Sequence, residues 1–138
     1  MFDFSGKRAL ITGASGGIGS EIAESLHLRG ATVTLSGTRE QALDALASKL
    51  GERVHVVVGD LSSVEDAQYL LDATNNVMGD INILVNNAGI TKDNLLLWMN
   101  DTEWESVVGI SLKGFYNVTN TILQDMIKLR KGILIKIL

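Results

Sequence analysis

The chain has 138 residues, of which 46% are hydrophobic and 20% are charged, and its formal net charge is −4 at pH 7. This balance is typical of a globular domain and argues against a nucleic-acid partner, which requires a basic surface. With no cysteine and only two histidines, the chain cannot form disulfides or thiolate metal sites, and we expect no metal ion. No apolar run reaches the length of a signal peptide core or a membrane span, so we expect a cytoplasmic protein without a membrane partner.

Five short apolar runs, rich in valine, isoleucine and leucine, alternate with helical patterns along the chain. The expected strands are Arg8–Thr12, Ala31–Ser36, Val54–Val58, Ile81–Val85 and Ile133–Leu138. The expected helices are Ile18–Arg29, Glu40–Leu50, Val64–Val77 and Glu103–Arg130, the third preceded by a capping box of Ser62 with Glu65. Continuous apolar strands that alternate with helices predict a parallel sheet covered on both faces. We therefore expect one α/β domain over residues 1–138, with the doubly wound order of a Rossmann-like fold.

The last predicted helix carries an apolar stripe, and the last predicted strand follows it. The stripe consists of Phe115, Val118, Ile122, Met126 and Leu129, spaced by three or four residues. Packing on the sheet explains most of it, and a share in a homo- or hetero-oligomeric interface is a second interpretation. The fifth strand is predicted to be an unpaired apolar edge, which favours association.

A glycine-rich stretch joins the first predicted strand to the first predicted helix. Residues 12–19 read Thr-Gly-Ala-Ser-Gly-Gly-Ile-Gly. Glycine at Gly13 allows a tight turn, and Gly17 and Gly19 allow the backbone to approach a pyrophosphate and the helix to pack on the strand. The amides at the helix N-terminus then face the anion. The candidate cofactor contacts in this stretch are Gly13, Ala14, Ser15, Gly16, Gly17, Ile18 and Gly19.

Two other interpretations of the glycine-rich stretch remain open at this stage. One is a strand–helix connection that binds nothing. The other is the nucleophile elbow of a hydrolase, because residues 13–17 also match Gly-x-Ser-x-Gly. That chemistry needs a histidine and an acid that reach Ser15, whereas His27 falls inside the adjoining helix and His55 starts a strand. The hydrolase interpretation also leaves Gly19 unexplained.

A second motif lies directly after the fourth predicted strand, where residues 86–89 read Asn-Asn-Ala-Gly. Together with the glycine stretch, it resembles the short-chain dehydrogenase/reductase family, and the resemblance runs from Phe4 to about Gly132. The following residues 90–96, Ile-Thr-Lys-Asp-Asn-Leu-Leu, with Met99 and Trp104, are similar to the family's bacterial ketoreductases of fatty-acid synthesis. The resemblance implies a nicotinamide cofactor and the reduction of a 3-oxoacyl thioester carried by acyl-carrier protein.

The resemblance also implies roles for particular residues beyond the glycine stretch. Asp60 and Leu61 match the pair that brackets the adenine, and Asn87, Ala88 and Gly89 match residues beside the cofactor's ribose. Arg130, in a basic group at the end of the last predicted helix, matches an arginine that helps to dock the acidic carrier. A simpler interpretation of that basic group is complementation of the helix dipole.

The end of the second predicted strand bears on the choice between NADP and NAD. An NAD site places an acidic residue there to accept a hydrogen bond from the ribose 2′-hydroxyl. Residues 36–39 instead read Ser-Gly-Thr-Arg, with no carboxylate before Glu40. Thr38 and Arg39 could bind a 2′-phosphate that a carboxylate would repel, so we expect NADP(H).

The catalytic groups of the family are not found in these residues. A family tyrosine donates the proton, and a lysine four residues later lowers its pKa from near 10. Here Tyr69 is followed at that spacing by Ala73, and Tyr116 by Asn120. Ser111 occupies the family's asparagine position, and the sequence stops where the family's serine would come next.

We therefore expect an incomplete NADP-binding domain, truncated after the fifth strand and inactive by itself. A frameshift or premature stop near Gly132 would produce such an ending. The alternatives are a non-catalytic NADP(H)-binding module, a partner subunit of a full-length reductase, and a truncation product without function.

Overall fold

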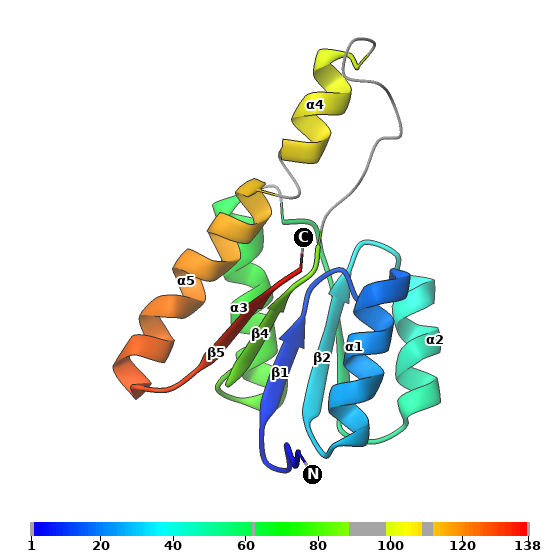
Figure 1. Ribbon diagram of the computed structural model, residues 1–138, viewed down its shortest axis with the longest axis vertical. Helices are drawn as coiled ribbons and strands as arrows, with labels where there is room; N and C mark the ends of the chain where they lie inside the picture. The colour runs from blue at the N-terminus through cyan, green and yellow to red at the C-terminus, as the bar shows by residue number, and fades with distance from the viewer. Residues whose placement is uncertain (1, 62, 89–98, 109–111, 138) are drawn as a thin grey trace.

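The computed structural model describes residues 2–61, 63–88, 99–108 and 112–137. Five parallel strands form one sheet in the order β3-β2-β1-β4-β5 (Figure 1). The strands are β1 (Arg8–Ile11), β2 (Thr32–Gly37), β3 (Val54–Val58), β4 (Ile83–Asn86) and β5 (Ile133–Lys136). This order confirms the predicted Rossmann-like sheet, in which the chain moves outward from β1 in one direction and then in the other.

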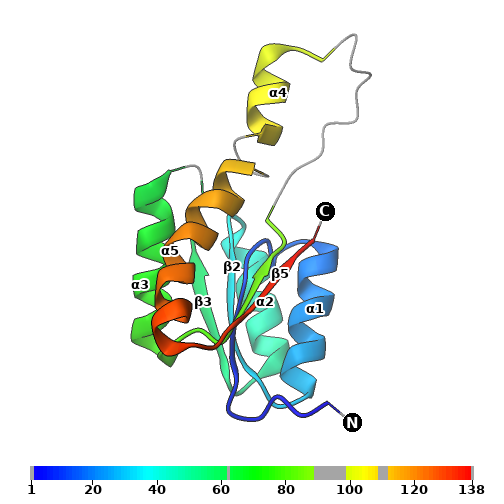
Figure 2. The same ribbon diagram turned by 60° about the vertical axis from the view of Figure 1, so that its left-hand side comes forward.

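Helices cover both faces of the sheet, as Figure 2 shows from the side. On one face lie α1 (Gly17–Leu28) and α2 (Glu40–Leu50), and on the other lie α3 (Val64–Met78) and α5 (Gly114–Leu129). The short α4 (Asp101–Val108) stands apart from both layers and has no buried residue. Among the described residues, no helix is long and apolar enough to cross a membrane.

Alternate residues of the central strands divide the core into two clusters. In β4, Ile83 and Val85 belong to the cluster under α1 and α2, whereas Leu84 belongs to the cluster under α3 and α5. The central strands are apolar on both faces because a helix layer covers each face there. This explains why the strand sequences read as continuous runs of valine, isoleucine and leucine.

Two local predictions were wrong. The helix predicted over Glu103–Arg130 is two helices, α4 and α5, on either side of residues 109–111, which lie outside the described residues. The sequence there, with Gly109 and the β-branched Ile110, has low helix propensity. The cap of α3 is Ser63 and not Ser62, which is also outside the described residues, because the Ser63 hydroxyl accepts a hydrogen bond from the Asp66 N–H at 3.1 Å.

The apolar stripe of the last helix faces mainly inward. Val118, Ile122 and Met126 are buried in the cluster beneath α3 and α5, which confirms packing on the sheet as the main role of the stripe. Leu129 is 43% exposed and does not share that burial. A different set of apolar side chains, including Tyr116 and Ile127, is exposed on the outer side of α5.

Candidate nucleotide-binding site

The glycine-rich loop and the turn after β4 meet at the carboxyl ends of the central strands, and Thr12 joins them. The Thr12 hydroxyl accepts hydrogen bonds from the backbone N–H groups of Asn87 (3.1 Å) and Ala88 (3.0 Å) and donates one to the Val85 carbonyl (3.3 Å). The side-chain amide of Asn87 donates to the Gly13 carbonyl at 3.1 Å. Thr12 is only 1% exposed. The sequence pattern did not assign Thr12 this role, although a threonine as the last residue before a glycine turn was the available signal.

Two glycines of the loop are required by this close packing. Gly13 has φ +66°, and a Cβ there would lie 2.9 Å from the Ala88 Cα. A Cβ on Gly19 would lie 2.3 Å from the Gly13 carbonyl oxygen and 2.6 Å from the Asn87 side-chain nitrogen. The structure therefore gives Gly13 the predicted tight turn and Gly19 the predicted close packing of helix on strand.

The other two glycines face open space. A Cβ on Gly17 would meet no protein atom within 4 Å, and one on Gly16 would meet only the Gly13 carbonyl oxygen, at 3.6 Å. Helix α1 begins here with Gly16 as its N-cap, without a capping side chain and without an acidic residue in the first turn. A helix N-terminus of this kind, with no carboxylate and no side chain over it, fits a phosphate group. This open backbone at Gly16 and Gly17, here called the cradle, has room for an anion and no acidic side chain in the first turn of α1 that would repel one.

The end of β2 borders the same loop. The Ala14 N–H donates to the Ser36 carbonyl at 2.9 Å, and the Arg39 guanidinium donates to the Ser15 carbonyl at 2.5 Å. A Cβ on Gly37 would lie 2.8 Å from the Ser15 hydroxyl oxygen. Thr38 and Arg39 are both exposed. Their polar groups therefore lie at the rim of the loop, and among the described residues no acidic side chain precedes Glu40 at this strand end.

The remaining predicted cofactor residues lie at the same edge of the sheet or outside the described part of the chain. Asp60 follows β3 and is exposed, whereas the Leu61 side chain is buried in the cluster beneath α3 and α5. Any contact of Leu61 with a ligand would therefore use its backbone. Gly89 and Ser111 both lie outside the described residues.

Arg130 lies away from these residues. It is exposed at the C-terminal end of α5, where it adopts a left-handed conformation with φ +55°. Because α5 runs opposite to the strands, this end lies at the amino edge of the sheet, and the glycine loop lies at the carboxyl edge (Figure 1). The structure does not bring Arg130 together with the cofactor residues.

The structure does not support a hydrolase elbow at Ser15. The His27 ring bonds the Glu52 carbonyl at 2.6 Å, at the end of α1 away from the loop. His55 lies near the start of β3, also at the opposite edge of the sheet. Neither histidine reaches Ser15, and among the described residues no group of three or more His, Cys, Asp or Glu could hold a metal ion.

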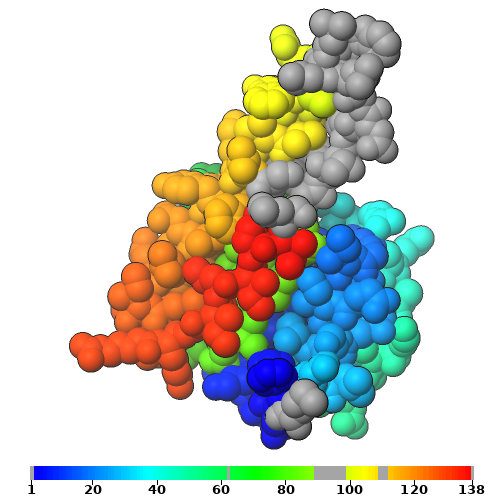
Figure 3. Space-filling model, viewed as in Figure 1, coloured from blue at the N-terminus to red at the C-terminus, as the bar shows by residue number. Residues whose placement is uncertain are grey.

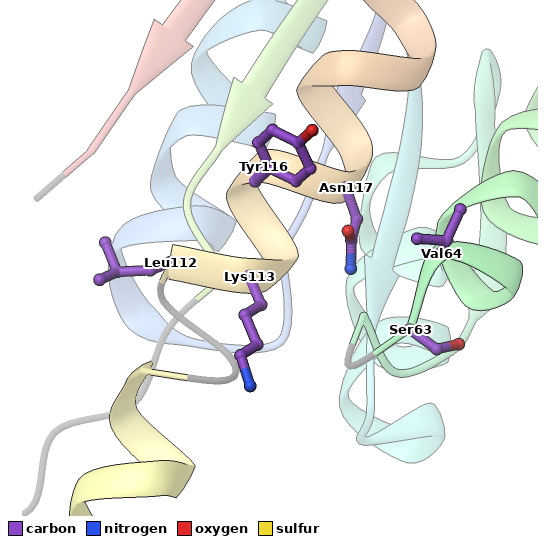
Figure 4. Close-up of a pocket in the computed structure, with 6 residues that line it drawn as sticks. All are labelled: Ser63, Val64, Leu112, Lys113, Tyr116 and Asn117. Atoms are coloured by element: carbon purple, nitrogen blue, oxygen red, sulfur yellow. The ribbon is translucent and has the colours of Figure 1, made fainter.

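A separate hollow of about 390 Å³ lies between the first turns of α3 and α5 (Figure 4). It is lined by Ser63, Val64, Leu112, Lys113, Tyr116 and Asn117. None of these is a predicted cofactor residue, and the Ser63 hydroxyl already caps α3. This hollow is therefore distinct from the glycine-loop site.

The sheet order and the glycine loop at its carboxyl edge define a Rossmann-type α/β domain. A family model described as short chain dehydrogenase matches residues 7–138. The chain belongs to this family, and membership implies a nicotinamide cofactor, NAD or NADP.

Among curated proteins, the chain is similar to relatives with two different names. It is 42% identical over 137 residues to nodulation protein G of Rhizobium meliloti, covering 99% of this chain and 56% of that protein. It is 43% identical over 132 residues to the 3-oxoacyl-[acyl-carrier-protein] reductase FabG of Vibrio harveyi, covering 96% and 54%. It is 38% identical over 135 residues to the Escherichia coli reductase of the same name, covering 98% and 55%. The chain thus spans about half the length of these relatives.

Proposed function

We propose that this chain is the NADP(H)-binding part of a reductase that converts 3-oxoacyl thioesters of acyl-carrier protein to 3-hydroxyacyl thioesters. The observation that carries the proposal is the cradle at Gly16 and Gly17, which is open and free of acidic side chains at the start of α1. The names of the FabG relatives support the substrate class.

In this proposal, each part of the site holds one part of the cofactor. The first-turn amides of α1 bind the pyrophosphate, and the turn at Asn87 and Ala88, fixed by Thr12, supports the adjacent ribose. Asp60 and the backbone of Leu61 lie beside the adenine. When bound, the cofactor supplies a hydride to the ketone carbon.

The proton requires a separate group. No tyrosine of these 138 residues has a lysine four positions later. We therefore propose that the 138 residues alone bind cofactor and do not turn over substrate, and that turnover needs further polypeptide. A non-catalytic binding module or a partner subunit would also bind cofactor without turnover. The reductase proposal predicts that further polypeptide restores reduction of the substrate, whereas a non-catalytic binding module would stay inactive.

Arg39 is the residue proposed to select NADP(H). Its guanidinium is held at the loop by the Ser15 carbonyl and is exposed, so it can pair with a 2′-phosphate without rearrangement of the backbone. We expect Arg39→Ala to weaken NADPH binding roughly tenfold or more and NADH binding by less than about threefold, measured by calorimetry. Arg29→Ala is the matched control, because Arg29 is an exposed arginine bonded to Ser25 at the far end of α1. Equal losses for both cofactors would contradict the role of Arg39.

Gly17 provides the test of the cradle itself. Since a Cβ at Gly17 meets no protein atom, Gly17→Ala should leave the free energy of unfolding unchanged or slightly raised. If the pyrophosphate occupies this space, the same change should weaken binding of both NADPH and NADH by roughly tenfold or more. Unchanged affinity for both cofactors, with the protein folded, would show that the cradle is not the binding site.

Carrier docking is proposed for the basic end of α5. Lys128, Arg130 and Lys131 are exposed there, at the opposite edge of the sheet from the cradle. An acidic carrier would be attracted to this group. We expect Arg130→Glu to weaken binding of acyl-carrier protein while leaving NADPH affinity unchanged, with both affinities measured by calorimetry. Unchanged carrier affinity would show that the basic group does not bind the carrier and only complements the dipole of α5.

A further inference from the structure

The hollow between α3 and α5 contains a buried polar side chain that the fold does not use. Asn117 lines the hollow and is only 8% exposed. Its backbone carbonyl accepts a hydrogen bond from the Thr121 hydroxyl at 2.8 Å, but within the described part of the chain its carboxamide has no partner. Figure 4 shows this side chain directed from α5 into the gap beside Val64 and Ser63 of α3. Because a buried carboxamide without a partner costs free energy, its presence here points to a ligand.

A cation lies beside this carboxamide. Lys113 is the N-cap residue of α5 and precedes Asn117 by four residues, a spacing that places both side chains on one face of the helix. Figure 4 shows the two side chains extending from α5 in the same direction, whereas the Tyr116 hydroxyl points away from the Lys113 ammonium. Lys113 is exposed, and no ion pair joins it to a described residue. The ammonium and the carboxamide are therefore both available to one bound group.

The chemistry of these two side chains selects the charge of the ligand. The ammonium offers only hydrogen-bond donors, and the carboxamide adds further donors and a single acceptor oxygen. A carboxylate matches them, because both of its oxygens accept and its charge balances that of the lysine. The acidic residues Glu65 and Asp66, in the first turn of α3, do not line the hollow. The anion would therefore be recognised by the side chains of α5 and not by the N-terminus of α3.

The remaining walls of the hollow are mostly apolar. Val64, Leu112 and Tyr116 line it and are each more than half exposed. Figure 3 shows α5, in orange, at the surface on the side of the molecule opposite α1, in blue. A few polar groups among apolar walls are typical of small-molecule sites, and the volume of about 390 Å³ lies within the range of such sites.

We propose that this hollow is a second binding site, which takes a small amphipathic carboxylate. The carboxylate accepts hydrogen bonds from Lys113 and Asn117, and the alkyl chain packs on Val64 and Tyr116. No predicted cofactor residue lines the hollow, so the site is independent of the glycine loop.

The test titrates octanoate into the 138-residue chain and follows the backbone amides by nuclear magnetic resonance. The amides of Val64, Tyr116 and Asn117 should shift along one saturable curve, whereas those of Gly17 and Ala88 should not move. Octan-1-ol has the same chain length without the charge, and butyrate has the charge with a shorter chain. Each should bind roughly tenfold or more weakly than octanoate if both halves of the ligand are recognised.

Two variants test the two polar side chains. Lys113→Met and Asn117→Leu should each weaken octanoate binding roughly tenfold or more. Lys7→Met is the matched control, since Lys7 is an exposed lysine directly before β1, and it should leave the affinity unchanged. Asn117→Leu should also leave the midpoint of urea unfolding unchanged or raise it, because it replaces a carboxamide without a partner by an apolar side chain of similar size.

Several results would overturn the proposal. They are no saturable binding of octanoate, shifts centred on Ile127 of the outer side of α5, octan-1-ol binding as tightly as octanoate, and equal weakening by Lys113→Met and Lys7→Met. A lower urea midpoint for Asn117→Leu would show that the carboxamide has a structural role instead. NADPH affinity should be the same in all of these variants, so the failure of this site and the failure of the proposed function are measured separately.

Discussion

Replacing Thr12 with valine would test the connection that holds the glycine loop to the turn after β4. Valine has nearly the same shape but no hydroxyl, so the N–H groups of Asn87 and Ala88 lose their acceptor. The Val85 carbonyl keeps its bond to the Thr12 backbone N–H at 3.1 Å. A buried donor without a partner costs about 1–3 kcal/mol, and because both amides are partly buried we expect about 2–4 kcal/mol for the pair.

Urea unfolding followed by circular dichroism measures this loss. With a slope of about 2 kcal/mol per molar urea, the midpoint should fall by roughly 1–2 M. Thr12→Ser is the matched control, since it keeps the hydroxyl and removes one methyl group, at a cost of about 1 kcal/mol. If the valine variant unfolds within about 0.3 M of the unmodified chain, or if serine costs as much as valine, the hydroxyl does not hold the two segments together.

Three further changes have expected outcomes. Gly19→Ala should leave the chain unfolded or without measurable nucleotide affinity, because its Cβ would lie 2.3 Å from the Gly13 carbonyl oxygen; a stable, binding-competent variant would disprove the packing. Ser63→Ala should lower the free energy of unfolding by about 1 kcal/mol through loss of the α3 cap, whereas no change in the urea midpoint would place the cap elsewhere. The Glu24 hydrogen bond raises the pKa of Lys49 above 10.5. The small stabilisation from this exposed pair should therefore be present below pH 10.5 and lost as the pH rises through the raised pKa. A stability difference between the unmodified chain and Lys49→Met that grows above pH 10.5 would contradict this.

The sequence predicted the sheet well because its central strands β1, β2 and β4 are mostly buried and its outer strands are also apolar. Runs such as Val54–Val58 are apolar apart from His55 near the strand start, so little in them would shift the strand register. The glycine loop identifies β1 as the strand from which the sheet extends in both directions. The stripe of Val118, Ile122 and Met126 was equally readable, because burial on a sheet requires that spacing.

Other features depended on contacts that the local sequence does not contain. The choice of Ser63 over Ser62 as the α3 cap is decided by which hydroxyl meets the Asp66 N–H, and both serines satisfy the pattern. The role of Thr12 depends on residues about 75 positions away, and the exposure of Leu129 depends on where α5 leaves the sheet. Such long-range geometry cannot be inferred from spacing alone.

The bond from Thr12 to Ala88 has a consequence for the order of events during synthesis. β1 is made first, yet its neighbour β4 follows only after two strands and three helices, so the glycine loop and the turn after β4 meet late. A nascent chain that has not yet released β4 from the ribosome has the glycine loop but not the turn that fixes it. With the site proposed above, nucleotide affinity would therefore arise when β4 inserts beside β1. From then on bound cofactor would stabilise the folded chain against unfolding by about 2.7 kcal/mol at a hundred times its Kd. Cofactor binding would thus report that β4 has paired with β1 at the centre of the sheet, before any chemistry takes place.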